Sequence, residues 1–206
     1  MISPGNKSDV IWDRGKWIFL DIGFSSKGRT CGLAFGDGSP QKLTYGAATR
    51  SIVDNLRNEE GLINLVIEAP LSVSFDKNGN PKGRKIEKRD SDTRYWYTGL
   101  GCAVMTAAMY LIRDIHEATK HSPNIEVRLF EGFVSFKENE TDHRDDVCAL
   151  REKVRNAAWH QKSVVGPEDL ITSEEDKICS AFRVAGLDFG VPAVIIAYLG
   201  EVVTAV

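Results

Sequence analysis

The sequence has no long apolar run and no large excess of charge of one sign. Its most apolar stretch, residues 191–206, is too short and contains Glu201, whereas a membrane-spanning helix needs about 20 apolar residues. The first ten residues are polar and include Pro4 and Gly5, so they do not resemble a secretory signal. We therefore expect a protein that does not associate with a membrane.

The charge balance is close to neutral, with 26 Lys and Arg against 29 Asp and Glu and a formal net charge of −3. Any contact with nucleic acid must then use a local basic patch, because the overall field does not attract phosphates. Apolar residues make up 42% and charged residues 27%, which excludes a disordered chain, a collagen and a coiled coil. A length of 206 residues suits one domain. We assign that domain to residues 15–206 and expect residues 1–14 to be a flexible N-terminus.

Cysteine and histidine are scarce, and neither occurs in a metal-binding spacing. There is no CxxC pair and no HExxH motif, so a zinc site is not expected. The cysteines are far apart among apolar neighbours, which is typical of buried free thiols in a reducing cytoplasm. The residues concerned are Cys31, Cys102, Cys148 and Cys179, and His116, His121, His143 and His160.

Hydrophobic patterning predicts three leading strands followed by alternating helices and strands. The strands are expected over residues 16–22, 30–35, 42–45, 62–68 and 125–130, and the helices over 48–58, 95–118, 142–160, 174–185 and 191–198. The polar residues 75–92, which contain Gly and Pro, predict a loop. This order predicts an α/β fold with a mixed five-stranded sheet, three leading antiparallel strands and helices on both faces.

Two acidic residues end strongly apolar predicted strands. Asp21 follows WIFL, and Glu68 follows LINLVI. A carboxylate in such a run is costly unless it is paired, hydrogen-bonded or bound to a metal. The alternative for Asp21 is that it orders the turn at Gly23, and for Glu68 that it reaches solvent or pairs with an arginine. If the two strands are neighbours, both carboxylates project at the sheet edge where ligands of open α/β sheets gather.

Two further acids are candidates for the same cluster. Glu131 ends the strand EVRLF, with a solvent-facing position as the alternative, and Asp188 precedes the last apolar segment, where it could cap a helix. Carboxylates that converge repel one another unless cations lie among them, and hard oxygen ligands select Mg²⁺ or Mn²⁺. Two such ions can activate a water and stabilise the leaving oxygen of a phosphoryl displacement.

A basic segment with adjacent aromatic residues follows Glu68. We expect Arg84, Arg89 and Arg94 to position a nucleic-acid backbone. The aromatic residues 95–97 could stack a base, or they could belong to the core.

These motifs resemble the ribonuclease H-like superfamily, and within it a widespread family of uncharacterised predicted nucleases, with Holliday-junction resolvases as more distant relatives. The likeness rests on the Asp21-Ile22-Gly23 strand end with the glycine-bearing strand that follows, on Glu68-Ala69-Pro70, on the basic segment ending at Arg94, on the segment 131–136 and on Asp188. The chain departs from that family after Glu131, where residues 132–134 are Gly-Phe-Val in place of His-Pro-Glu, and after Asp188, where Phe189 replaces Ala.

The resemblance implies a divalent-metal-dependent nuclease that hydrolyses phosphodiester bonds in DNA or RNA. Asp21, Glu68 and Asp188 would be catalytic metal ligands, with Glu131 as a fourth ligand, and the ion would be Mg²⁺ or Mn²⁺. Residues 21–28 also resemble the first phosphate loop of actin-like ATPases, although those enzymes need two lobes and this chain has room for one. A non-catalytic scaffold of this fold therefore stays open as the alternative, as does a homodimer.

Overall fold

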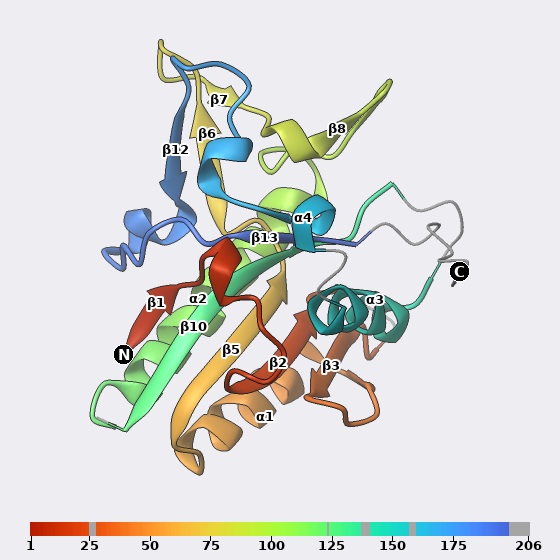
Figure 1. Cartoon of the computed structure of the whole chain (residues 1–206), viewed down its shortest axis with the longest axis vertical. Coiled ribbons are helices and arrows are strands. Elements are labelled where there is room, and N and C mark those ends of the chain that lie inside the picture. The colour runs from red at the N-terminus through yellow and green to blue at the C-terminus, as the bar shows by residue number, and fades with distance from the viewer. Residues whose placement is uncertain (25–27, 123, 137–140, 157–159, 198–206) are drawn as a thin grey trace.

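A mixed β-sheet forms the centre of the computed structural model, which describes residues 1–24, 28–122, 124–136, 141–156 and 160–197 (Figure 1). The strand order is β11-β13-β10-β5-β2-β3-β4, and β1 also pairs with β10. The strands are β1 (Ile2–Pro4), β2 (Lys16–Asp21), β3 (Cys31–Phe35), β4 (Gln41–Leu43), β5 (Gly61–Glu68), β10 (Ile125–Phe133), β11 (Val164–Val165) and β13 (Val194–Ile196). The neighbours β2, β5, β10 and β13 are parallel, whereas β3, β4 and β11 are antiparallel to the strands they pair with.

Helices cover both faces of this sheet. On one face, α1 (Tyr45–Arg57) and α2 (Leu100–Thr119) pack on residues such as Ile18 and Leu20 of β2. On the other face, α3 (His143–Arg155) packs on Trp17 and Phe19. Successive residues of β2 point to opposite faces of the sheet, because side chains in a strand alternate with a period of two residues. Both faces are covered by helices, which explains why the sequences of β2 and β5 are continuously apolar. The predicted α/β class with a mixed sheet is confirmed.

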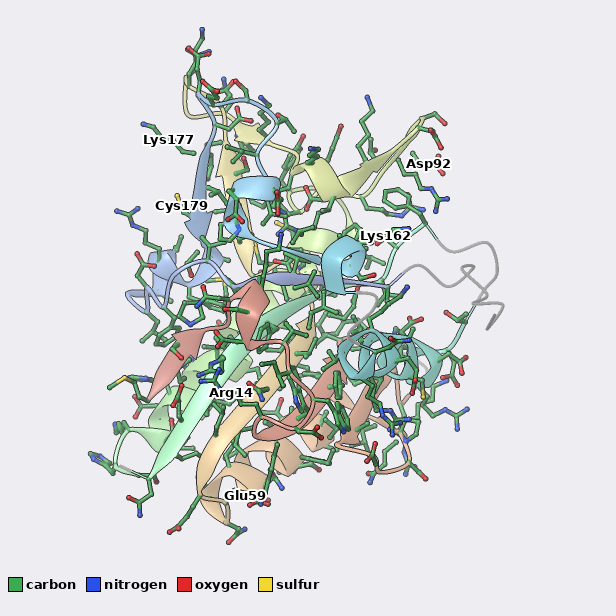
Figure 2. All side chains as sticks on the ribbon, viewed as in Figure 1. Arg14, Glu59, Asp92, Lys162, Lys177 and Cys179 are labelled. Carbon is green, nitrogen blue, oxygen red and sulfur yellow. The ribbon has the colours of Figure 1, made fainter. Side chains whose placement is uncertain are left out.

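The segment predicted as a loop over residues 75–92 carries strands of its own. A second sheet has the order β12-β6-β7, and a hairpin of β8 and β9 follows it. These strands are β6 (Ser72–Phe75), β7 (Pro81–Lys82), β8 (Lys88–Arg89), β9 (Asp92–Thr93) and β12 (Lys177–Ser180). Figure 1 shows this part above the main sheet, and Figure 2 shows Asp92 at the projecting tip of the hairpin. The remaining helices are short: η1 (Lys7–Asp9), η2 (Lys85–Glu87), α4 (His160–Ser163), η4 (Pro167–Asp169) and η5 (Ala181–Ala185).

The N-terminal residues, which we expected to be flexible, are instead packed into the sheet. β1 lies parallel to β10, with Ile2 beside Val127, and the Met1 ammonium group donates a hydrogen bond of 2.6 Å to the Ile125 carbonyl oxygen. Val10 is fully buried against the α3 face. The segment is mostly polar, so its sequence did not indicate that Ile2 and Val10 are buried.

Two predicted C-terminal helices are also wrong. Residues 174–185 contain strand β12 and the 3-10 helix η5, and the predicted helix 191–198 is replaced by strand β13, its last residue lying outside the described part of the chain. A short apolar run does not distinguish a buried strand from a buried helix, and here a parallel position beside β10 decides the outcome. Within the described residues, no helix has the length and apolarity needed to cross a membrane.

Candidate metal centre

The two strand-end acids lie side by side in the sheet. Asp21 of β2 is in register with Glu68 of β5, and Glu68 is in register with Gly132 of β10. Because Asp21 follows Trp17 and Phe19 at alternate positions, its side chain projects on the face covered by α3. Asp21 is almost fully buried and Glu68 is half-buried. The predicted convergence of these two acids is therefore present.

The first turn of α3 brings two more metal-ligating side chains to this edge. Asp142 is the N-cap and accepts a hydrogen bond of 2.7 Å from the Arg144 backbone N–H, which fixes where the helix begins. His143 and Asp146 are three residues apart, so they project from the same side of the helix. His143 Nδ1 lies 2.8 Å from Asp21 Oδ2, and Thr141 Oγ1 donates to Asp146 Oδ1 at 2.8 Å.

Two glycines let the helix approach the strand ends this closely. A Cβ on Gly23 would overlap the imidazole of His143, and one on Gly32 would lie 2.6 Å from the His143 carbonyl carbon. Gly32 is in register with Asp21. The absence of side chains at these positions therefore sets the distance between His143 and Asp21.

We expect Gly32→Ala to separate α3 from β3 and to weaken the centre. Overpacking of this kind costs typically about 1–3 kcal/mol, so the free energy of unfolding in a urea titration should fall by that amount. Divalent-ion affinity should fall in the same variant. Gly36→Ala is the control for a general glycine effect: its φ is +49° but its Cβ meets open space, so it should lose stability without losing ion affinity. Equal ion affinity in Gly32→Ala and wild type would contradict this account of the centre.

The chemistry of Asp21, His143 and Asp146 fits a divalent cation. One ligand atom each from Asp21, His143 and Asp146 lies within 4.8 Å of the other two. Asp21 and Asp146 are only 2% and 3% exposed, so their charges are shielded from water and need compensation. Two carboxylates with one imidazole suit Mn²⁺ as well as Mg²⁺.

The centre opens into a cavity of about 510 Å³. Its wall includes Asp21, His143 and Asp146 together with Glu68, and it also includes Arg94, Tyr95 and Ser135. Arg94 is exposed, and its guanidinium carbon lies 5.7 Å from the centre of the Phe136 ring. The predicted role of Arg94 beside a phosphate is thus compatible with its position. Arg89 lies on the exposed hairpin strand β8 and is not part of this wall.

The structure corrects the expected roles of Glu131 and Arg84. Glu131 precedes Gly132, so its side chain lies on the opposite face of β10 from the centre. Its Oε2 accepts hydrogen bonds of 2.8 Å from Arg84 Nη1 and from the Leu71 backbone N–H. Arg84 is fully buried and also donates to Glu87 Oε1 at 2.8 Å from Nη2. Neither a metal nor a backbone phosphate has access to these groups.

Electrostatics within this buried triad of Arg84, Glu87 and Glu131 keep Arg84 in its charged form. Burial lowers the pKa of Arg84, but the adjacent carboxylates outweigh that effect, so the pKa lies above its ordinary value. Burial raises the pKa of Glu87, and Arg84 opposes that increase. The triad joins the second sheet to β10 and is a structural element.

Asp188 is also corrected, because it lies away from the centre. Its side chain is 53% exposed and sits 3.8 Å from Arg183 Nε, while its Oδ1 accepts a hydrogen bond of 3.2 Å from the Gly190 backbone N–H. Residues 194–196 form a strand parallel to β10, and Asp188 comes before that strand, whereas Asp21 and Glu68 are the last residues of theirs. It therefore cannot join their cluster.

Sequence reasoning missed His143 and Asp146. The available signal was the DHRDD segment, in which a capping aspartate at position 142 precedes two ligand types at helical spacing. Of the residues that resemble a phosphate loop, 25–27 lie outside the described part of the chain.

Comparison with protein-family models, with curated proteins and with solved structures finds no match for this chain.

Proposed function

We propose that the chain is a divalent-metal-dependent nuclease that hydrolyses phosphodiester bonds in DNA or RNA. The observation that carries this proposal is the meeting of Asp21, Glu68, His143 and Asp146 in one cavity whose wall also contains Arg94. Carboxylates and a cation-binding imidazole beside an arginine provide both a metal site and a phosphate contact.

A ribonuclease H-like fold is part of the proposal. After β1, the next three strands, β2, β3 and β4, are antiparallel to one another, and β5 and β10 extend the sheet in parallel on the other side of β2. Helices lie on both faces. These features support the arrangement that the sequence resemblance implies, with β1, β11 and β13 as additions at the β10 edge.

Each side chain has a distinct task in the proposed reaction. Asp21, Glu68, His143 and Asp146 would hold the ion, and Mg²⁺ or Mn²⁺ would supply an activated water and neutralise charge on the leaving oxygen. His143 is oriented by its contact with Asp21. Arg94 would bind a non-bridging phosphate oxygen and so orient the phosphorus, with its guanidinium held in place against Phe136.

Thermal unfolding tests whether the centre binds metal. Mn²⁺ or Mg²⁺ at about 100 times its Kd should stabilise the wild type by about 2.7 kcal/mol, which is a Tm increase of roughly 5–10 °C for a chain of this size. Asp21→Asn should lose most of that increase. Asp188→Asn removes an acid outside the cavity and should keep it. If millimolar Mn²⁺ and Mg²⁺ leave the wild-type Tm unchanged, the nuclease proposal fails and a non-catalytic scaffold becomes the better interpretation.

A further inference from the structure

A second cavity of about 510 Å³ lies next to the metal centre, between the second sheet and the segment that leads into α2. We call it the tyrosine groove. Its wall is formed by Pro81, Lys82, Gly83, Arg84, Lys85, Lys88, Asp90, Tyr95, Tyr97 and Thr172. Neither the proposed reaction nor the metal site uses most of these residues.

Two tyrosine rings stack in this groove. Tyr95 and Tyr97 have ring centres 5.3 Å apart with an angle of 17° between the planes. Between them in sequence, Trp96 is buried on the other side, where it packs on Val73 and Phe75. A turn, closed by a hydrogen bond of 3.1 Å from the Thr98 N–H to the Tyr95 carbonyl oxygen, thus places Trp96 in the core and both tyrosine rings in the groove.

The stacked pair is held in position by buried hydrogen bonds. The Trp96 backbone N–H donates to Glu87 Oε1 at 3.0 Å, and its indole N–H donates to the Lys82 carbonyl oxygen at 3.0 Å. Tyr95 also packs on Gly83, where a Cβ would overlap the ring. A stacking surface fixed in this way loses little entropy when a flat ligand binds.

Lysines give the groove a positive balance. Lys82 is paired with Asp176 at 2.7 Å, and Arg84 is neutralised inside the buried triad. Lys85 and Lys88 are exposed, and neither forms an ion pair with any residue in the described part of the chain. Among the described residues, Asp90 is the one acid in the wall. Cations beside an aromatic stack match the phosphates and bases of an unpaired nucleic-acid strand.

The tyrosine groove adjoins the cavity of the metal centre, because Tyr95 belongs to the wall of both cavities. Arg94 precedes it on the metal side, and Tyr97 follows it on the groove side. A strand whose phosphate lies at the metal centre would therefore place its adjacent nucleotides on the tyrosines.

We propose that the tyrosine groove binds unpaired nucleotides next to the phosphate that is cleaved, so that the substrate class is single-stranded nucleic acid. This inference rests on the proposed nuclease function. Stacking on a tyrosine face requires a base that is not enclosed in a duplex, which is why single strands are favoured over paired ones.

Fluorescence anisotropy in EDTA tests the groove without cleavage. The probes are labelled oligothymidylate, oligouridylate and a DNA duplex of equal length. Tyr97→Ala should raise the Kd for the single strands by about 5- to 100-fold, whereas Tyr97→Phe, which keeps the ring, should stay within about twofold of wild type. Replacing Lys85 and Lys88 by Gln should reduce the slope of log Kd against log salt by about 1.4, since each phosphate contact to a single strand contributes about 0.7.

Tyr110→Ala is the matched control, because Tyr110 is 54% exposed on α2 and lies outside both cavities. It should bind like wild type. The inference is overturned if Tyr97→Ala binds both single strands within twofold of wild type, or if the duplex binds as tightly as they do. Tyr97-dependent binding together with no metal response and no cleavage would overturn the nuclease while the groove assignment stands. Metal-dependent cleavage without Tyr97-dependent binding would overturn the groove assignment while the nuclease proposal stands.

Discussion

Asp146→Asn is expected to reduce metal-dependent cleavage of nucleic acid by more than about 100-fold. Loss of a group that only orients a metal ligand costs about 10- to 100-fold in affinity or activity, and Asp146 would be a direct ligand. Asn keeps the oxygen that accepts the hydrogen bond from Thr141, so the start of α3 should be preserved while the negative charge is lost. The measurement is the single-turnover cleavage rate of single-stranded DNA and RNA with Mn²⁺ and with Mg²⁺.

Asp145→Asn is the control for this experiment. Asp145 is the next residue in the same turn but is exposed, and its carboxylate accepts a hydrogen bond of 3.1 Å from the Asp142 backbone N–H. An asparagine oxygen can accept the same bond, so activity should remain close to wild type. Equal losses in both variants would mean that the charge of the helix start matters and that Asp146 has no special role.

The largest loss of stability is expected from Arg84→Met, with about 3–5 kcal/mol removed from the free energy of unfolding. Breaking a buried ion pair from one side leaves a buried charge without its partner, which has a cost in this range. Here two carboxylates would be left, those of Glu87 and Glu131, and both are fully buried. They cannot turn away, because they also accept hydrogen bonds from the backbone N–H groups of Trp96 and Leu71.

The loss should depend on pH in a defined direction. Without Arg84 the pKa of Glu87 rises further in the folded state, since burial raises it and Arg84 no longer opposes that increase. The folded variant then binds more protons than the unfolded chain, so its stability falls as pH increases. Urea titrations at pH 5 and pH 8 should therefore show the smaller deficit at the lower pH. Arg183→Met, which changes an exposed arginine, should stay within about 0.5 kcal/mol of wild type.

The part of the centre that sequence could predict is the part built by strands. Asp21 and Glu68 each end an apolar run in which a charged residue is unexpected. Because β2 and β5 are parallel neighbours, the ends of the two strands lie at the same edge of the sheet. His143 and Asp146 come from a helix more than 70 residues further along the chain. Their position depends on how α3 packs over Gly23 and Gly32, and a local pattern holds no information about that packing.

The basic segment shows a different limit of sequence reasoning. Arg84 and Arg94 have similar polar neighbours in the sequence, yet one is fully buried between two carboxylates and the other lines an open cavity. What separates them is the position of Glu131, which is 47 residues from Arg84 and reaches it only through the sheet. The same contact explains why a strand-end glutamate did not become a ligand. Glu131 and Arg84, when each is interpreted alone, both resemble site residues. In the fold they form a buried ion pair with one another.

The pairing of β10 also limits the order in which the chain can fold. Its outer edge is shared by β1 from the beginning of the chain and β13 from near its end, and the contact between Met1 and Ile125 spans 124 residues. At a synthesis rate of about 5–20 residues per second, β1 would wait roughly 6–25 s on the ribosome for its partner. Because contacts of such long range also slow refolding, the closing of this edge should be a late kinetic step. Shortening the chain before β13 would leave half of that edge exposed to association with other strands.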